Sequence, residues 1–462
     1  LVRRSLGGRE LVMYAFNGQH PGPLVRVPQG ATIVVDLVNR LDQPTAVHWH
    51  GVRLENRSDG VPGLTQPPIP PGDTFRYRVR FPDAGIYWYH PHHREDAQQD
   101  LGLAGNLLVR PSRPDHYGPA NREEVLLLDD LLVGDDGLVP YGRETTTHAL
   151  MGRVGNLLLV NGEPSYSLRV RRGEVVRFHL TNAANARVFN LSFGGARMKV
   201  VGTDVGRFAR EAWVESVVLA PAERYVVDVR FDRPGRHPIE NRVQAIHRQA
   251  GAFFTDVDTL GAVEVSPEPA VPDHGAAFAR LRQDPALAAE AARLRARHGG
   301  APARELTLTL RPGDLPFPLV QALRVDTGYV HPVEWSATMP MMDWLSTGRQ
   351  VEWVLRDRAS GRENMAIAWR FRRGELLRLR LVNDRHTLHP MAHPIHVHGQ
   401  RFLVLAVNGV PNDNPAWKDT VLVPVGATVD LLVELANPGR WMLHCHIAEH
   451  LTAGMHLTFE VT

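Results

Sequence analysis

The sequence is poor in cysteine, in lysine and in long apolar runs. Cys445 is the only cysteine among 462 residues, so no disulfide can form within the chain and the thiol needs another explanation. Lys199 and Lys418 are the only lysines, so arginine supplies nearly all of the 52 basic residues. This bias, with 35 prolines, favours a GC-rich, thermophilic source. No apolar run approaches the ~20 residues of a membrane-spanning helix, so we expect no membrane insertion.

The charge and composition are those of an ordinary globular protein. Fifty acidic residues nearly balance the 52 basic ones, which gives no reason to expect a nucleic-acid or anionic-membrane partner. With 43% hydrophobic and 22% charged residues, disorder, coiled coil and collagen are excluded. The length suggests about three domains. The chain opens on Leu1 without the apolar stretch of a secretory signal, so we expect a mature or trimmed chain.

Short alternating segments separated by Gly, Pro and Asn dominate the chain. Residues 32–38 and 74–79 are examples, and such segments predict half-buried antiparallel strands in β-sandwiches. One region differs, because residues 276–283 and 286–297 are rich in Ala, Arg and Leu and predict helices. They follow a proline-rich stretch at 267–272, and we interpret the region as a linker.

A sequence repeat divides the chain. An Arg, Gly, Leu and Asn with fixed spacing occur at Arg26, Gly30, Leu37 and Asn39, and the same spacing recurs from Arg169 and from Arg370. A second block that ends in glycine follows each copy. We therefore expect three β-rich domains and one linker, at residues 1–115, 116–265, 266–303 (the linker) and 304–462.

Four His-x-His pairs occupy equivalent places in the first and third copies, and the middle copy lacks them. On a strand, residues i and i+2 point to the same face and lie ~6.6 Å apart, which suits two imidazoles that reach adjacent metals. One such pair could arise by chance, but four at equivalent positions predict a multinuclear cluster between the first and third domains. Zinc is the plainer alternative, although a zinc site needs only three or four ligands. The pairs are His48/His50, His90/His92, His396/His398 and His444/His446.

Cys445 indicates which metal is bound. It lies between His444 and His446, so on a strand its sulfur points to the opposite face and predicts a second site behind the first. His393, His450 and Met455 are close in sequence. Two histidines, a cysteine and a weak axial methionine form the blue-copper electron-transfer site. A buried inert thiol is the usual alternative for a lone cysteine, but these flanking residues disfavour it.

These motifs together resemble the four copper-binding motifs of the multicopper oxidases, and above all those of three-domain bacterial laccases. The resemblance covers essentially the whole chain. It implies an all-β fold of three cupredoxin-like Greek-key sandwich domains, with the helical linker before the third. The strings that carry it are residues 48–51, 89–92, 393–399 and 444–455.

The resemblance also implies four copper ions, one of type 1, one of type 2 and two of type 3. The type 1 ligands would be His393, Cys445, His450 and Met455, and the type 2 ligands would be His48 and His396. The type 3 pair would take His50, His90, His92, His398, His444 and His446.

The implied reaction is one-electron oxidation of small aromatic substrates, coupled to reduction of dioxygen to water. Substrate would lose an electron near His450 or His393, whose ring edges we expect to face solvent. The electron would pass from Cys445 through His444 and His446. Asp59 lies where bacterial relatives carry an acid thought to relay protons, although a plain turn residue in Ser58-Asp59-Gly60 is the alternative.

A second acid of the bacterial pattern is absent. Leu451 stands directly after His450, where the relatives carry a carboxylate, and Glu449 is the residue that would compensate. The proton path is therefore predicted only in part.

Three alternative functions stay open at this point. Met339, Met341 and Met342 would bind Cu(I) as soft ligands if the protein were a cuprous oxidase, whereas gap-filling core methionine is the plainer interpretation. A non-catalytic cupredoxin-fold binding protein is disfavoured because all twelve ligand positions are filled. A copper nitrite reductase is disfavoured because histidines flank Cys445 on both sides. Family resemblance further predicts a monomer exported to the periplasm or outside.

Overall fold

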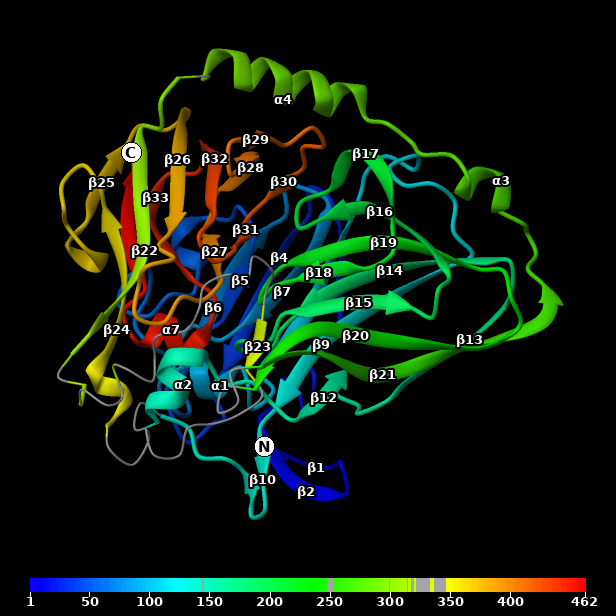
Figure 1. Ribbon diagram of the computed structural model, residues 1–462, viewed down its shortest axis with the longest axis horizontal. Helices are drawn as coiled ribbons and strands as arrows, with labels where there is room; N and C mark the ends of the chain where they lie inside the picture. Colours follow the sequence, from blue (N-terminus) through cyan, green and yellow to red (C-terminus); the bar gives the residue numbers. More distant parts are fainter. Residues whose placement is uncertain are drawn as a thin grey trace.

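The computed structural model confirms the predicted all-β class. Strands form three groups of sheets that, apart from β23, follow one another along the chain (Figure 1). We name these groups the first, second and third modules. The structure describes residues 1–142, 145–247, 252–298, 300–313, 315–316, 320, 333–335 and 346–462. Met339, Met341 and Met342 lie outside the described residues.

The first module has a four-stranded sheet, in the order β3-β8-β7-β5, and a two-stranded sheet of β4 and β6. Exposed and more buried residues alternate along β4 and β6, as the sequence predicted. An N-terminal hairpin and two short helices complete this part of the chain. The elements are β1 (Val2–Leu6), β2 (Arg9–Met13), β3 (Val25–Pro28), β4 (Thr32–Val38), β5 (His48–His50), η1 (Asn56–Ser58), β6 (Thr74–Arg80), β7 (Gly85–His90), α1 (Glu95–Gln98) and β8 (Gly105–Arg110).

The second module packs a six-stranded sheet, β12-β9-β14-β19-β16-β17, with the sheet β13-β21-β20-β15-β18, to which β23 adds. Its elements are β9 (Arg122–Leu131), β10 (Val133–Gly134), β11 (Gly137–Leu138), α2 (Thr146–Met151), β12 (Leu157–Val160), β13 (Tyr166–Arg172), β14 (Glu174–Asn182), β15 (Phe189–Phe193), β16 (Arg197–Thr203), β17 (Arg207–Val214), β18 (Val217–Leu219), β19 (Arg224–Phe231), β20 (Gly235–His247), β21 (Ala252–Pro269) and β23 (Val333–Trp335).

The third module combines the sheet β24-β22-β26-β32-β28-β29, with β30 paired to β28, and the sheet β25-β34-β33-β27-β31. Its elements are β22 (Arg304–Pro312), η2 (Gly348–Gln350), β24 (Val351–Asp357), η3 (Asn364–Ala366), β25 (Ala368–Phe371), β26 (Glu375–Asn383), β27 (His393–Val397), β28 (Arg401–Val407), β29 (Val410–Pro411), β30 (Trp417–Lys418), β31 (Thr420–Val423), β32 (Thr428–Leu435), β33 (Gly439–Cys445), α7 (Ala448–Thr452) and β34 (His456–Val461).

The repeated glycine and asparagine have the same backbone conformation or hydrogen-bonding pattern in each module. Gly30, Gly173 and Gly374 all have φ between 84° and 88°, a left-handed turn conformation that glycine adopts without strain. Each donates its backbone N–H to the carbonyl of the residue four positions before the glycine that ends the second block, for example Gly30 to Phe81 at 2.7 Å. The repeated Asn39, Asn182 and Asn383 each donate from Nδ2 to two backbone carbonyls. The repeat therefore records one turn geometry used three times.

The linker helices are only partly as predicted. Helix α4 (Pro285–Arg297) begins behind Asp284, whose side chain accepts from the Leu287 N–H at 3.1 Å. Helix α3 (Gly275–Phe278) is shorter than the predicted 276–283. Residues 280–283 instead bond to β16 and β17, where Lys199 Nζ donates to the Arg280 carbonyl and Glu211 donates its backbone N–H to the Arg282 carbonyl. Figure 1 shows α4 crossing from the second module toward β22.

The packing of the modules locates the site. One apolar core contains residues of both the first and the third modules, for example Trp49, Leu107, Ile395 and Trp441. The second module has its own core around Phe178 and Phe231. Because the first and third modules share a core, their histidine-bearing strands can meet there.

Candidate metal centre

Two strand pairs carry the histidines. In the first module β5 pairs antiparallel with β7, so that His48 lies opposite His90. In the third module β27 pairs with β33, so that His396 lies opposite His444 and Ile395 opposite Cys445. The equivalent pairing in two modules explains why the histidines recur at equivalent places in the repeat.

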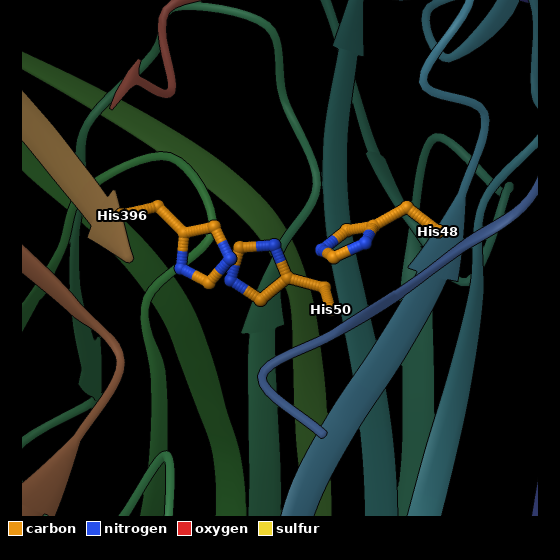
Figure 2. A group of neighbouring side chains, drawn as sticks. All are labelled: His48, His50 and His396. Atoms are coloured by element: carbon orange, nitrogen blue, oxygen red, sulfur yellow. The ribbon is translucent and has the colours of Figure 1, made fainter. Parts of the chain in front are cut away.

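The structure brings all eight paired histidines together in one buried cluster. Figure 2 shows His48, His50 and His396, and the rings of His50 and His396 are stacked at 3.7 Å between centroids although they come from different modules. In each of three groups, the ligand atoms lie within 4.8 Å of one another. The groups are His48/His50/His396, His50/His90/His446 and His92/His398/His444.

In four of the cluster rings, the nitrogen that points away from the centre of the cluster is held by a hydrogen bond to the backbone. The Nδ1 atoms of four rings lie 2.8–2.9 Å from backbone carbonyls, those of Asp59, Pro91, Asp419 and Cys445. An N–H that donates outward leaves the other nitrogen of the ring free as a metal ligand. These four rings are His48, His90, His396 and His444.

The ring nitrogens that point toward the centre of the cluster are available as metal ligands. Within the described part of the chain, six of them are buried without a hydrogen-bond partner, namely His48 Nε2, His50 Nδ1, His90 Nε2, His92 Nε2, His396 Nε2 and His446 Nε2. The remaining two, on His398 and His444, lie 3.0 Å from each other. Buried polar atoms normally have partners, so a cluster of orphaned imidazole nitrogens fits bound copper.

Burial keeps most of these rings neutral, the form that binds metal. Burial, and then neighbouring histidines, hold the pKa values of His90, His398 and His444 well below the usual range. His92 is the exception. Burial alone would lower its pKa, but the Glu95 carboxylate, 2.5 Å from His92 Nδ1, outweighs burial and raises the pKa.

Asp59 lies against the cluster, between histidines of the first and third modules. The side chain is fully buried, with Oδ2 at 2.9 Å from His398 Nδ1 and Oδ1 at 3.3 Å from His48 Nδ1. Gly60 follows with φ 80°, and a Cβ there would lie 1.8 Å from the Val47 carbonyl oxygen. The tight turn therefore holds the carboxylate between histidines of two modules.

A second site lies behind the cluster, around Cys445. Its Sγ is 3.6 Å from His393 Nδ1 and 3.7 Å from His450 Nδ1, and all three residues are buried. Met455 is fully buried, and its carbonyl accepts from the Cys445 N–H at 3.0 Å. Burial raises the pKa of the Cys445 thiol, so a thiolate here needs a cation. The two imidazoles and the sulfur form a soft donor set that fits copper.

The ring edges of His393 and His450 do not face solvent, contrary to our expectation. Their exposed fractions are 1% and 0%. Helix α2 of the second module covers His450, whose Nε2–H donates to the Leu150 carbonyl at 3.1 Å. The Trp353 ring packs against the same imidazole at 4.2 Å between centroids and donates to the Ala149 carbonyl.

Sequence reasoning missed two carboxylates that contact the cluster. Glu95 stands three residues after His92 on α1, and Asp419 lies 3.1 Å from His50 Nε2 although 369 residues separate them. The i,i+3 spacing was the only available signal for Glu95, and Asp419 had none. Glu449 is buried and accepts from Asn185 at 3.3 Å, and burial and Asp96 raise its pKa to about 8.

This chain is similar to multicopper oxidases over nearly its whole length. Three family models described as multicopper oxidase match residues 3–114, 88–257 and 334–462. The chain is 29% identical to "Multicopper oxidase MmcO" of Mycobacterium tuberculosis over 98% of this chain and 84% of that protein. It is 26% identical to "Laccase-1" of Cryptococcus neoformans over 97% of this chain and 77% of that protein.

A solved structure shows the same fold. The multicopper oxidase of Campylobacter jejuni, titled a metallo-oxidase, superposes with a TM-score of 0.75 at 22% identity, over 100% of this chain and 89% of that one. The cupredoxin-like architecture that the sequence predicted is therefore confirmed. In the described residues, no helix is long and apolar enough to cross a membrane.

Proposed function

The chain belongs to the multicopper oxidase family, and from this we propose that it is a laccase-type oxidase that couples one-electron oxidation of phenolic or aromatic substrates to reduction of dioxygen. The observation that carries the proposal is the pair of adjacent donor sets. Eight buried imidazoles converge in one cluster, and a cysteine between two of them points to a separate site.

We propose four coppers, held as the family pattern implies. The type 1 site takes His393, Cys445, His450 and Met455, and the type 2 site takes His48 and His396. The grouping of His50/His90/His446 and of His92/His398/His444 supports one type 3 ion in each triplet. When bound, the coppers supply one-electron oxidation of substrate and four-electron reduction of dioxygen to two waters.

The chain itself supplies the connection between the two sites. Cys445 Sγ faces one site, and its two backbone neighbours, His444 and His446, face the other. His444 Nδ1 also donates to the Cys445 carbonyl at 2.9 Å, which closes a short loop between them. We therefore assign Cys445, His444 and His446 as the residues that link the sites.

Asp59 is the residue proposed to hold and deliver protons. Dioxygen reduction consumes protons, and this carboxylate contacts His48 and His398 from the outer side of both rings. A carboxylate fixed at hydrogen-bond distance is suited to general acid–base work. Glu95 supports a second route, because its carboxylate lies 2.5 Å from His92 Nδ1 and its side chain is only 12% exposed.

Cuprous oxidase activity is the second candidate, and the covered type 1 histidines favour it. Because Leu150 and Trp353 cover His450, and His393 is also buried, a bulky phenol has no exposed ring edge of either histidine to contact. A small cation such as Cu(I) needs less space than an aromatic ring.

We further propose that dioxygen is the oxidant, that the protein is a monomer, and that it acts in the periplasm or outside the cell.

The test combines copper quantification with an oxygen electrode. The purified, copper-loaded chain is given 2,6-dimethoxyphenol or Cu(I), and oxygen uptake is recorded against a chelated control. We expect about four coppers per chain and uptake with at least one donor. Faster uptake with the phenol supports the laccase type, and uptake only with Cu(I) supports the cuprous oxidase. Uptake with neither donor by a fully loaded chain would refute the oxidase proposal.

Removal of copper is expected to lower thermal stability strongly. A ligand that binds only the folded state at about 1,000 times its dissociation constant adds about 4 kcal/mol per site. The orphaned, buried imidazoles lose their only partners in the apoprotein. We therefore expect the apparent Tm to fall by roughly 10 °C or more. Calorimetry of loaded, chelated and reloaded protein measures this, and unchanged melting of the chelated sample would contradict it.

A further inference from the structure

A charged pair between two modules lies directly behind the histidine cluster. Asp419 stands between β30 and β31 of the third module and is fully buried. His50 Nε2–H donates to its Oδ1 at 3.1 Å, and His396 Nδ1–H donates to its backbone carbonyl at 2.9 Å. Thr420 Oγ1 lies 3.0 Å from His50 Nε2 and donates to the Asp419 carboxylate at 2.9 Å. Asp419 thus contacts one ring of each module, His50 through its carboxylate and His396 through its backbone carbonyl.

Arg224 of the second module grips this carboxylate. It is the first residue of β19, is fully buried, and donates from Nη1 to Asp419 Oδ1 at 2.7 Å and from Nη2 to Oδ2 at 2.5 Å. Its Nε donates to the Ile86 carbonyl of the first module at 2.9 Å. Two-pronged contacts of this kind fix direction as well as charge. A single guanidinium therefore touches all three modules.

The sequence after His50 leaves room for the pair. Gly51 has φ 82°, and a Cβ at this position would lie 2.3 Å from Asp419 Oδ2 and 2.7 Å from Arg224 Nη2. Any larger residue would push the carboxylate or the guanidinium away from the cluster. The glycine that follows the first histidine pair is therefore explained by the Arg224–Asp419 pair.

Asp204 and Lys418 add further buried charges beside the Arg224–Asp419 pair. Asp204 lies 3.6 Å from Arg224 and 3.2 Å from Lys418, and its carboxylate accepts from the backbone N–H groups of Asp419 and Thr420. All of these groups are buried. Removing one partner of such a pair leaves an uncompensated charge in the interior, which the fold relieves by moving or neutralising it.

We propose that Arg224 is a positioning residue of the metal cluster, through which the module without copper ligands completes the site. By holding Asp419 in place, it keeps the His50 Nε2–H and the His396 Nδ1–H turned outward, so that His50 Nδ1 and His396 Nε2 face the metals. The inference rests on the proposed copper cluster and deepens it, because it assigns a role in that cluster to the second module. Outer partners of this kind typically contribute 10–100-fold to metal affinity.

The test compares Arg224→Met and Arg224→Lys with a matched pair elsewhere. Arg177 also makes a buried two-pronged contact, with Asp228 inside the second module, and its hydrogen bonds go to Asp228, Glu123 and Gly118 and to no cluster histidine. All variants are loaded with copper as full chains and dialysed against a graded chelator. Copper per chain, the blue absorbance and the type 2 electron paramagnetic resonance signal are then recorded.

For Arg224→Met we expect cluster copper to be released at 10–100-fold lower chelator concentration, with the blue site retained. We expect a smaller loss of cluster copper for Arg224→Lys, because lysine keeps the positive charge but cannot donate to both carboxylate oxygens as the guanidinium does. The folded Arg177→Met protein is expected to keep wild-type copper retention. If Arg224→Met does not fold, Asp419→Asn replaces it with the same expectation, since it removes the anionic acceptor in place.

The proposal is overturned if Arg224→Met retains cluster copper and an unchanged type 2 signal, or if Arg177→Met loses cluster copper equally. Failure of the proposed function looks different, because wild-type protein would then hold no cluster copper at all. The two failures are therefore distinguishable in one set of samples.

Discussion

Cys445→Ser is expected to abolish the blue colour and to reduce substrate-driven oxygen uptake to the level of a buffer blank. Serine keeps the size of the side chain but removes the soft sulfur that, with His393 and His450, makes this donor set suited to cycling copper. No other cysteine can replace it. The eight cluster imidazoles are unchanged, so about three coppers should remain per chain. Visible absorbance, copper content and oxygen uptake measure the three effects.

Met455→Leu is the matched control for this substitution. It removes a buried thioether from the same site but leaves the thiolate, so blue colour and measurable activity should persist. A Cys445→Ser protein that still oxidised the donor would show that electrons enter elsewhere. That result would remove the type 1 assignment, whatever the state of the cluster.

Asp59→Asn is expected to slow turnover by about 100-fold or more while leaving reduction of the blue site unchanged. Asparagine keeps the shape of the side chain between His48 and His398 but cannot take up or release a proton. A positioned acid or base typically contributes 10²–10⁴-fold. Anaerobic stopped-flow reduction and oxygen reoxidation of the reduced enzyme measure the two halves separately.

Glu449→Gln provides the comparison for Asp59→Asn. Glu449 hydrogen bonds to Asn185 and has a raised pKa of about 8, but no contact with a cluster imidazole is seen among its hydrogen bonds. We expect its substitution to affect reoxidation much less than Asp59→Asn does. The reverse order would move the proton path to Glu449 and leave Asp59 as a structural residue.

Local spacing predicted much of the fold and of the cluster. The His-x-His pairs follow the two-residue period of a strand, so their common face could be derived from the sequence before any pairing was known. The repeated Gly30 and Asn39 positions marked a turn geometry that each module reproduces. The start of α4 was equally local, because Asp284 and Pro285 cap it directly.

Long-range contacts could not be predicted in the same way. Helix α3 ends early because residues 280–283 bond to β16 and β17, which no local pattern reveals. The covering of His450 by Leu150 joins residues 300 positions apart, and it corrected our expectation of an open ring edge. Asp419 and Arg224 meet across 195 positions, so their role emerged only from the packed modules.

The division of the cluster between the two ends of the chain has a consequence for its biogenesis. His92 and His396 are separated by about 300 residues, and ribosomes add about 5–20 residues per second. The first four imidazoles therefore emerge from the ribosome some 15–60 s before their counterparts exist. During that interval the nascent polypeptide presents half a binding site, open to whichever divalent ion is abundant nearby. Correct metallation must therefore wait until synthesis has ended and the last strands have docked.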